Sequence, residues 1–169
     1  MDAMEAILTR RSIRSYSDAA VSDEDVRAML GAAMSAPSAG NQQPWEFVVV
    51  NERAVLDAIP GFHPYSKMLL QAPLAILVCV DPGRERYAGC GVLDCSAATQ
   101  NLLLAAHALG LGAVWLGVHP YAERMEPMRR LLGIPERIIP LALICVGHTT
   151  EKAGRTDRFD PARIRYNSW

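Results

Sequence analysis

The stretch from Gly91 to Gly112, GVLDCSAATQNLLLAAHALGLG, constrains the fold more than any other part of this 169-residue chain. It has the pattern of a long helix that ends at the glycines Gly110 and Gly112. Apolar and small residues cover most of the circumference of that helix, so a position with one side in water is unfavourable. We therefore expect a central helix that is covered by protein, in part by a second subunit.

The segments around this helix predict a sheet. LAILVCV at 74–80 is a continuous apolar run of strand length, which is typical of a strand covered on both faces. Three more runs, WEFVVV at 45–50, AVWLGV at 113–118 and IIPLALICVG at 138–147, also predict strands. Shorter helices are expected over residues 1–9, 22–37, 53–59, 66–70 and 122–133, with Ser22 as an N-cap. Strands and helices do not alternate regularly, which favours an α+β fold with helices on a central sheet.

Length and composition indicate the class of protein. Residues 1–169 read as one domain, in which about residues 148–169 form a polar tail that needs a surface to lie on. The net charge of −1 gives no general attraction to nucleic acid or anionic lipid, so neither partner is expected. The four cysteines lack CxxC spacing, no metal site is indicated, and the amino terminus lacks the order of a secretory signal. We expect a cytoplasmic protein with reduced thiols.

The segment RRSIRSY contains the first candidate site. Arg10, Arg11 and Arg14, with the hydroxyl of Ser12, place several donors within a short length of chain, as a phosphate requires. Arg155 in the tail could converge on the same anion. The alternative is a solvated basic helix end that complements the helix dipole.

The segment SAPSAGNQQPW contains the second candidate site. Its prolines and glycine prevent regular structure, and the stretch from Pro37 and Ser38 to Asn41 can present backbone N–H groups and an amide to a ligand. The alternative is a structural turn, and for Trp45 packing in the core is the preferred interpretation.

Other common sites are not indicated. A GxSxG elbow, a P-loop and a GxGxxG fingerprint are all absent from the sequence. The four histidines show no metal-ligand spacing with the cysteines, and His107 is expected to be a satisfied histidine in an apolar helix.

Five segments occur in an order that resembles the FMN-dependent nitroreductase family, in particular its short members. They are RRSIRSY, SAPSAGNQQPW, YSKMLLQAP, GLGAVWLG and the tail RTDRFD…RIRYNSW, and together they extend over essentially the whole chain. The resemblance implies a mostly antiparallel central sheet flanked by helices. It also implies an intertwined homodimer with FMN at the subunit interface and the tail wrapped around the partner.

The resemblance implies a role for each candidate residue at the phosphate end. Arg10 and Ser12 match ligands of the flavin phosphate and ribityl chain, Arg11 lies beside them, and Arg155 matches a tail arginine that reaches the same phosphate. A phosphomonoester carries roughly −1.5 to −2 charges near neutral pH, which clustered arginines neutralise.

At the ring end, Arg14 and Lys67 match basic residues near the pyrimidine edge of the flavin. A cation there stabilises the anion that reduced flavin forms at N1. Leu116 and Gly117 match the position where a backbone N–H contacts flavin N5.

Pro37, Ser38 and Asn41 match the family loop that reaches the flavin from the partner subunit. Leu116 stands where larger members have an acidic residue, and the chain has no long insertion over the substrate face. Both differences leave the substrate open.

The function implied is hydride transfer from NADH or NADPH through FMN N5 to a small electron acceptor, such as a nitroaromatic compound or a quinone. No side chain need act as acid or base in the first half-reaction, so no catalytic residue is expected. The alternatives are reductive dehalogenation or another reaction of the same fold, a non-catalytic FMN carrier or redox sensor, and a cofactor-free interaction module.

Overall fold

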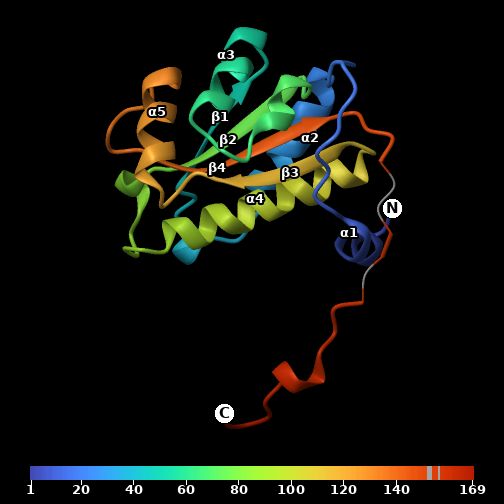
Figure 1. Ribbon diagram of the computed structural model, residues 1–169. Coiled ribbons are helices and arrows are strands. Elements are labelled where there is room, and N and C mark those ends of the chain that lie inside the picture. Colours follow the sequence, from blue (N-terminus) through green and yellow to red (C-terminus); the bar gives the residue numbers. More distant parts are fainter. Residues whose placement is uncertain (152–153, 156) are drawn as a thin grey trace.

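The centre of the molecule is a four-stranded antiparallel sheet, seen edge-on in the computed structural model of Figure 1, which describes residues 1–151, 154–155 and 157–169. The strands are β1 (Trp45–Val50), β2 (Leu74–Val80), β3 (Gly112–Gly117) and β4 (Ile139–Gly147). They follow the order β1-β2-β4-β3, so β1 and β3 are the edges. Every pair is antiparallel, which agrees with the predicted sheet.

Both faces of the sheet are covered, as the apolar run of β2 predicts. All seven residues of β2 are buried. Because successive side chains of a strand point to opposite faces, Ile76 and Val78 contribute to one hydrophobic cluster and Leu77 to another. The sheet therefore separates two cores.

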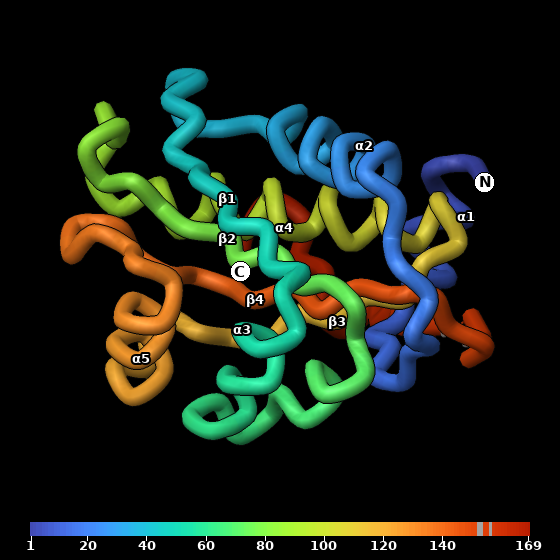
Figure 2. Tube along the Cα trace, turned by 90° about the horizontal axis from the view of Figure 1, so that it is seen from above, coloured from blue at the N-terminus to red at the C-terminus, as the bar shows by residue number. Residues whose placement is uncertain are grey.

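The helices form a layer on each side of the sheet. α4 (Gly91–Ala108) and α2 (Asp23–Met34) cover one face and pack against each other, while α3 (Arg53–Ala58) and α5 (Ala122–Leu132) lie on the other face (Figures 1 and 2). The short α1 (Ala3–Thr9) contacts α4. Residues 66–70, predicted as a helix, form a short 3-10 turn over Lys67–Leu70.

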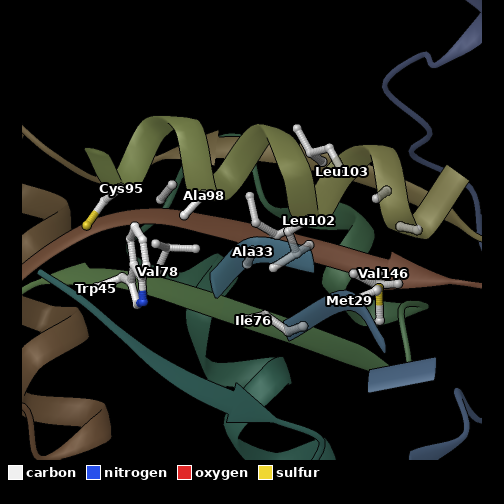
Figure 3. Packing of buried hydrophobic residues seen from close by; sticks show 14 of the residues in the cluster. Met29, Ala33, Trp45, Ile76, Val78, Cys95, Ala98, Leu102, Leu103 and Val146 are labelled. Atoms are coloured by element: carbon white, nitrogen blue, oxygen red, sulfur yellow. The ribbon is translucent and has the colours of Figure 1, made fainter. Parts of the chain in front are cut away.

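The core between α4 and the sheet is close-packed. Figure 3 shows Ala98 and Leu102 of α4 beside Val78, and Trp45 stands at the start of β1 in the same cluster. Trp45 is only 8% exposed, which confirms that it fills the core.

The outer face of α4 is left uncovered by its own chain. Its buried residues lie on the side of the sheet and α2, but Leu93 near its start is 69% exposed. Met4 and Ile7 of α1 and Leu109 after α4 are also exposed. A single chain therefore leaves a broad apolar surface, made by α1 and the outer side of α4, in contact with water.

The carboxyl-terminal tail leaves the body of the molecule and extends away from it (Figure 1). Phe159 and Tyr166 are 75% and 81% exposed, and Trp169 is fully exposed. The hydrogen bonds described for residues 157–169 join tail residues to one another, as where Asp160 caps the turn Pro161–Arg163. Of the helices in the described part of the chain, none has the length and apolar character that a membrane crossing requires.

Candidate functional site

The free edge of β3 brings together most of the predicted site residues. Ser12 forms a parallel bridge with Ala113, and the Ile13 N–H donates to the Ala113 carbonyl at 3.0 Å. The RRSIRSY segment therefore runs beside β3. Ser12 is exposed on this edge, with Arg10 and Arg11 toward one end and Arg14 toward the other.

The end that holds Arg10 and Arg11 has the properties of an anion site. Both arginines line a pocket of about 210 Å³. Arg10 Nε is buried and has no hydrogen-bond partner in the described part of the chain. Burial lowers the pKa of Arg10, and the charges of Arg11 and Arg158 lower it further. An anion would supply the missing acceptor and offset the repulsion between the cations.

His107 lines the same pocket and is held by α1. The Thr9 hydroxyl donates to the Glu5 carbonyl at 2.6 Å, so it accepts from His107 Nε2 at 2.8 Å. This bond agrees with the expectation of a satisfied histidine. Burial lowers the pKa of His107, and the charge of Arg10 lowers it further.

We expect an anion in this pocket to raise the pKa of His107. A phosphate beside Arg10 and Arg11 would offset the positive charges that disfavour the imidazolium form, and it would attract that form directly. An NMR titration of the His107 ring, with and without inorganic phosphate, measures the change. His63, whose ring lies beside the Gly117 carbonyl at the other end of β3, is the reference. A His107 pKa that stays the same or falls on phosphate binding would contradict the assignment of the pocket.

The other end of this edge opens into a pocket of about 400 Å³. Arg14 and Lys67, both exposed, face this pocket from two different segments. The complete lining is Arg14, Pro64, Tyr65, Lys67, Met68, Trp115, Leu116 and Gly117. The pocket thus combines two cations with aromatic and apolar surface, which suits a flat ring that can carry negative charge.

Gly117 presents its backbone to the free edge of β3 beside this pocket. The Ala113 carbonyl faces the free edge, where it accepts from Ile13, and backbone groups of alternate residues in a strand face the same side. Trp115 and Gly117 therefore face the free edge, whereas Leu116 directs its backbone toward β4. A Cβ atom at Gly117 would meet nothing within 4 Å, so the space above this glycine is open.

Two side chains that the sequence did not single out contact Gly117. His63 Nε2 donates to the Gly117 carbonyl at 3.0 Å, and Arg124 Nη1 donates to the same oxygen at 2.8 Å. His63 stands between Pro60 and Pro64 in PGFHP. The two prolines and the glycine in this segment indicate a turn that restricts the backbone around His63. They do not indicate that the partner of His63 lies 54 positions away.

The predicted loop between α2 and β1 is held rigidly by a buried carboxylate. Asp94, 7% exposed in the first turn of α4, accepts from the Ala39 N–H at 3.0 Å and from Gln42 Nε2 at 2.6 Å. Gln42 Oε1 in turn accepts from the N–H groups of Arg86 and Tyr87. This network fixes a turn in which Gly40, at φ 53°, has a left-handed conformation.

We expect Asp94→Ala to destabilise the protein by about 2–4 kcal/mol, because it removes a buried charged acceptor and leaves two donors unpaired. Chemical denaturation measures this change. Asp57→Ala is the matched control, because Asp57 forms an exposed ion pair with Arg53, and such pairs contribute at most about 1 kcal/mol. Equal losses in the two variants would contradict the role of Asp94 in holding the loop.

Within one chain this loop does not reach the rest of the site. Figure 2 shows the loop after α2 at the opposite end of the molecule from α1 and the amino terminus. Pro37 and Asn41 are exposed there, and Ser38 Oγ accepts from the Gln43 N–H at 3.1 Å. One chain thus carries the loop and the arginines at separate places.

Arg155, the tail residue expected to reach the phosphate, keeps that role as a prediction. Arg155 is exposed, whereas Arg158 is the tail residue whose charge acts on Arg10. A larger pocket of about 690 Å³, between Tyr16, Asp18, β1 and α3, contains none of the predicted site residues.

The residues along β3 fit a flavin mononucleotide. The unpaired Arg10 Nε and the cations around it suit a phosphate, the exposed Ser12 suits a polyhydroxyl chain, and the open space at Gly117 suits a flat ring. These features follow one another in the order in which the parts of the nucleotide are joined.

Comparisons with known proteins agree with this geometry. The family model described as "Nitroreductase family" matches residues 7–61 and 62–148. A protein of Methanothermobacter thermautotrophicus named "Putative NADH dehydrogenase/NAD(P)H nitroreductase" is 52% identical over 169 residues, which cover 100% of this chain and 88% of that protein.

Solved structures share the fold. The crystal structure of a protein of the same name from Parabacteroides distasonis has a TM-score of 0.94 and 41% identity, over 98% of each chain. A "putative nitroreductase in complex with fmn" from Desulfovibrio desulfuricans has a TM-score of 0.85 and 34% identity, over 100% of this chain and 99% of that chain.

Proposed function

Because this chain belongs to the nitroreductase family, we propose that it passes hydride from NADH or NADPH through FMN to a small electron acceptor. Its class is that of an NAD(P)H-dependent flavin oxidoreductase with FMN as the cofactor. The acceptor is a nitroaromatic compound, a quinone or a molecule of similar electron affinity. The observation that carries the proposal is the buried Arg10 Nε, which has no hydrogen-bond partner among the described residues, at one end of the β3 edge, with the open backbone of Gly117 at the other.

The functional unit is a homodimer of single-domain chains. The apolar surface of α1 and α4, where Leu93 is 69% exposed, is unfavourable in contact with water. A second copy of the chain provides the same apolar face and can bury it. The aromatic tail needs a surface as well, and the partner supplies one. In this dimer Pro37, Ser38 and Asn41 of one subunit complete the pocket that the other subunit forms along β3. The four free cysteines of each chain suit the reducing cytoplasm.

The residues of the chain bind and orient the cofactor. Arg10, Arg11 and a tail arginine hold the phosphate, and Ser12 donates to the sugar chain. Arg14 and Lys67 place positive charge where the reduced ring carries negative charge, which raises its potential. When bound, FMN supplies the redox chemistry, because its N5 can take up a hydride and release it again.

The pocket also limits the acceptor. It is about 400 Å³ and is lined by Tyr65 and Trp115 as well as by the two cations. Aromatic walls and positive charge favour a flat acceptor that is electron-poor or anionic. We propose that hydride transfer from NADH or NADPH to the bound flavin requires only a stacked arrangement and no acid or base from the protein.

An anaerobic absorbance measurement tests the proposed function. The protein loaded with FMN should show the flavin band at about 450 nm, and the band should bleach on addition of NADH or NADPH and return on addition of a quinone. A band that persists with both nucleotides would indicate a carrier or sensor instead. Protein that stays colourless after incubation with FMN and dialysis would exclude a flavin site.

A further inference from the structure

We propose that His63 and Arg124 are positioning residues that fix the Gly117–Val118 peptide and so restrict the adjoining Gly117 N–H, which faces the free edge of β3 beside the pocket. This inference rests on the proposed function, because that pocket is where we place the flavin ring. His63 and Arg124 come from two segments far apart in the sequence, and neither needs to touch the cofactor.

The two donors use the full hydrogen-bonding capacity of one oxygen. His63 Nε2 lies 3.0 Å and Arg124 Nη1 2.8 Å from the Gly117 carbonyl oxygen, which has two lone pairs. Gly117 has no side chain and open space around it, and a glycine is free to adopt many backbone conformations. The two hydrogen bonds to the Gly117 carbonyl, which we call the clamp, therefore fix the peptide that follows Gly117 and reduce the freedom of the residue at this end of the strand.

His63 is itself fixed in the form that can donate. It is 1% exposed, and its Nδ1 accepts from the Tyr65 N–H at 3.4 Å, so the ring hydrogen lies on Nε2. Burial lowers the pKa of His63 and the Arg124 charge lowers it further, although the bond to Gly117 opposes both effects. The neutral ring with its hydrogen on Nε2 is the form that this site favours.

Arg124 is held between two aromatic rings. Its guanidinium carbon lies 4.1 Å from the ring centre of Tyr121 and 5.3 Å from that of Tyr65. Stacking of this kind restricts a flexible side chain to one geometry. Tyr65 therefore contributes to both donors, through its backbone N–H to His63 and through its ring to Arg124.

A fixed Gly117 N–H affects the two redox states of a flavin differently. N5 of the oxidised ring accepts a hydrogen bond, whereas N5 of the reduced ring carries a hydrogen. The N–H therefore favours the oxidised ring, and a loosened Gly117 should weaken oxidised FMN more than reduced FMN.

The first measurement uses the protein without cofactor and is therefore independent of flavin binding. The ¹⁵N order parameter of the Gly117 amide should be close to about 0.85 in the unaltered protein and below about 0.6 in His63→Leu and in Arg124→Met. His63→Gln, whose amide can donate in place of Nε2, should keep the high value. Arg130→Met, on the exposed side of the same helix, is the matched control.

The second measurement uses the protein loaded with FMN. In His63→Leu and Arg124→Met the dissociation constant of oxidised FMN should rise about tenfold relative to that of reduced FMN, which corresponds to a rise of about 30 mV in the two-electron potential. His63→Gln and Arg130→Met should stay near the unaltered potential.

Three results would overturn the inference, and they separate it from the proposed function. If the order parameter of the Gly117 amide stays high in both Arg124→Met and His63→Leu, the two donors do not restrict Gly117. Equal changes in His63→Gln and His63→Leu would indicate loss of packing instead of loss of a donor. An unchanged potential in folded Arg124→Met would overturn the link to the cofactor, while FMN binding and bleaching in the unaltered protein would leave the proposed function intact.

Discussion

Arg10→Ala should weaken FMN binding about 30- to 100-fold while leaving the fold of the unloaded protein intact. The loss corresponds to about 2–3 kcal/mol, as expected for removal of charge-assisted hydrogen bonds to a phosphate. Arg10 Nε has no partner among the described residues, so the unloaded protein loses no hydrogen bond through this atom. Removal of a cation from the neighbourhood of Arg11 and Arg158 also relieves repulsion.

Quenching of flavin fluorescence on titration with protein gives the dissociation constant. Arg27→Ala is the matched control, because Arg27 is an exposed arginine on α2, away from the β3 edge. Thermal unfolding with and without FMN gives a second reading, since a ligand stabilises in proportion to the logarithm of its concentration over the dissociation constant. Equal dissociation constants of FMN for Arg10→Ala and Arg27→Ala would show that Arg10 does not bind the phosphate.

Removal of the tail after Thr150 should raise the dissociation constant of the dimer at least about a hundredfold and release FMN with it. Phe159, Tyr166 and Trp169 are the exposed aromatic residues of the tail, and burial of each large apolar side chain contributes about 1.5–3 kcal/mol. Even with a large cost for ordering the tail, more than 2.7 kcal/mol should remain, which is a factor of a hundred.

The truncation point preserves the body of the chain. β4 ends at Gly147, and the His148 carbonyl accepts from the Ser17 N–H at 2.9 Å, so both stay in place. Analytical ultracentrifugation over a range of concentrations measures the dimer. A full-length variant with serine at 159, 166 and 169 is the matched control, and it should behave like the truncated chain. A truncated protein that sediments as a flavin-loaded dimer at nanomolar concentration would show that the tail contributes little.

Local signals in the sequence predicted most of the fold. Ser22 was expected to cap a helix, and its Oγ accepts from the Asp25 N–H at 3.1 Å at the start of α2. The apolar run of β2 predicted burial on both faces, and each of its residues is buried. Such features depend on residues that are close together in the chain, so they can be predicted from the sequence alone.

Features that depend on distant partners were missed. Asp94 looked like one polar residue in an apolar helix, because the loop that it holds lies 55 positions earlier. His63 was set aside with the other histidines, since its partner is a backbone carbonyl, which has no sequence signal. The extent of the exposed face of α4 in a single chain was not predicted, because composition does not distinguish a surface covered by the same chain from one covered by another.

The site itself was predicted in part. The structure brings Arg14, Lys67 and Gly117 to one pocket and Arg10 and Arg11 to another along the same edge. The role of Arg155 stays a prediction, since Arg155 and Arg158 lie three positions apart and the sequence does not distinguish which of them approaches Arg10.

The separation of the loop at 37–41 from the arginines along β3 has a genetic consequence. If each pocket takes its loop from one copy and its arginines from the other, a copy damaged at the loop and a copy damaged at the arginines form a mixed pair with one pocket that is wholly intact. Two defective alleles could then restore each other's activity, although neither works alone. Heterozygous damage at either place would halve the number of working centres and leave the remaining one unimpaired.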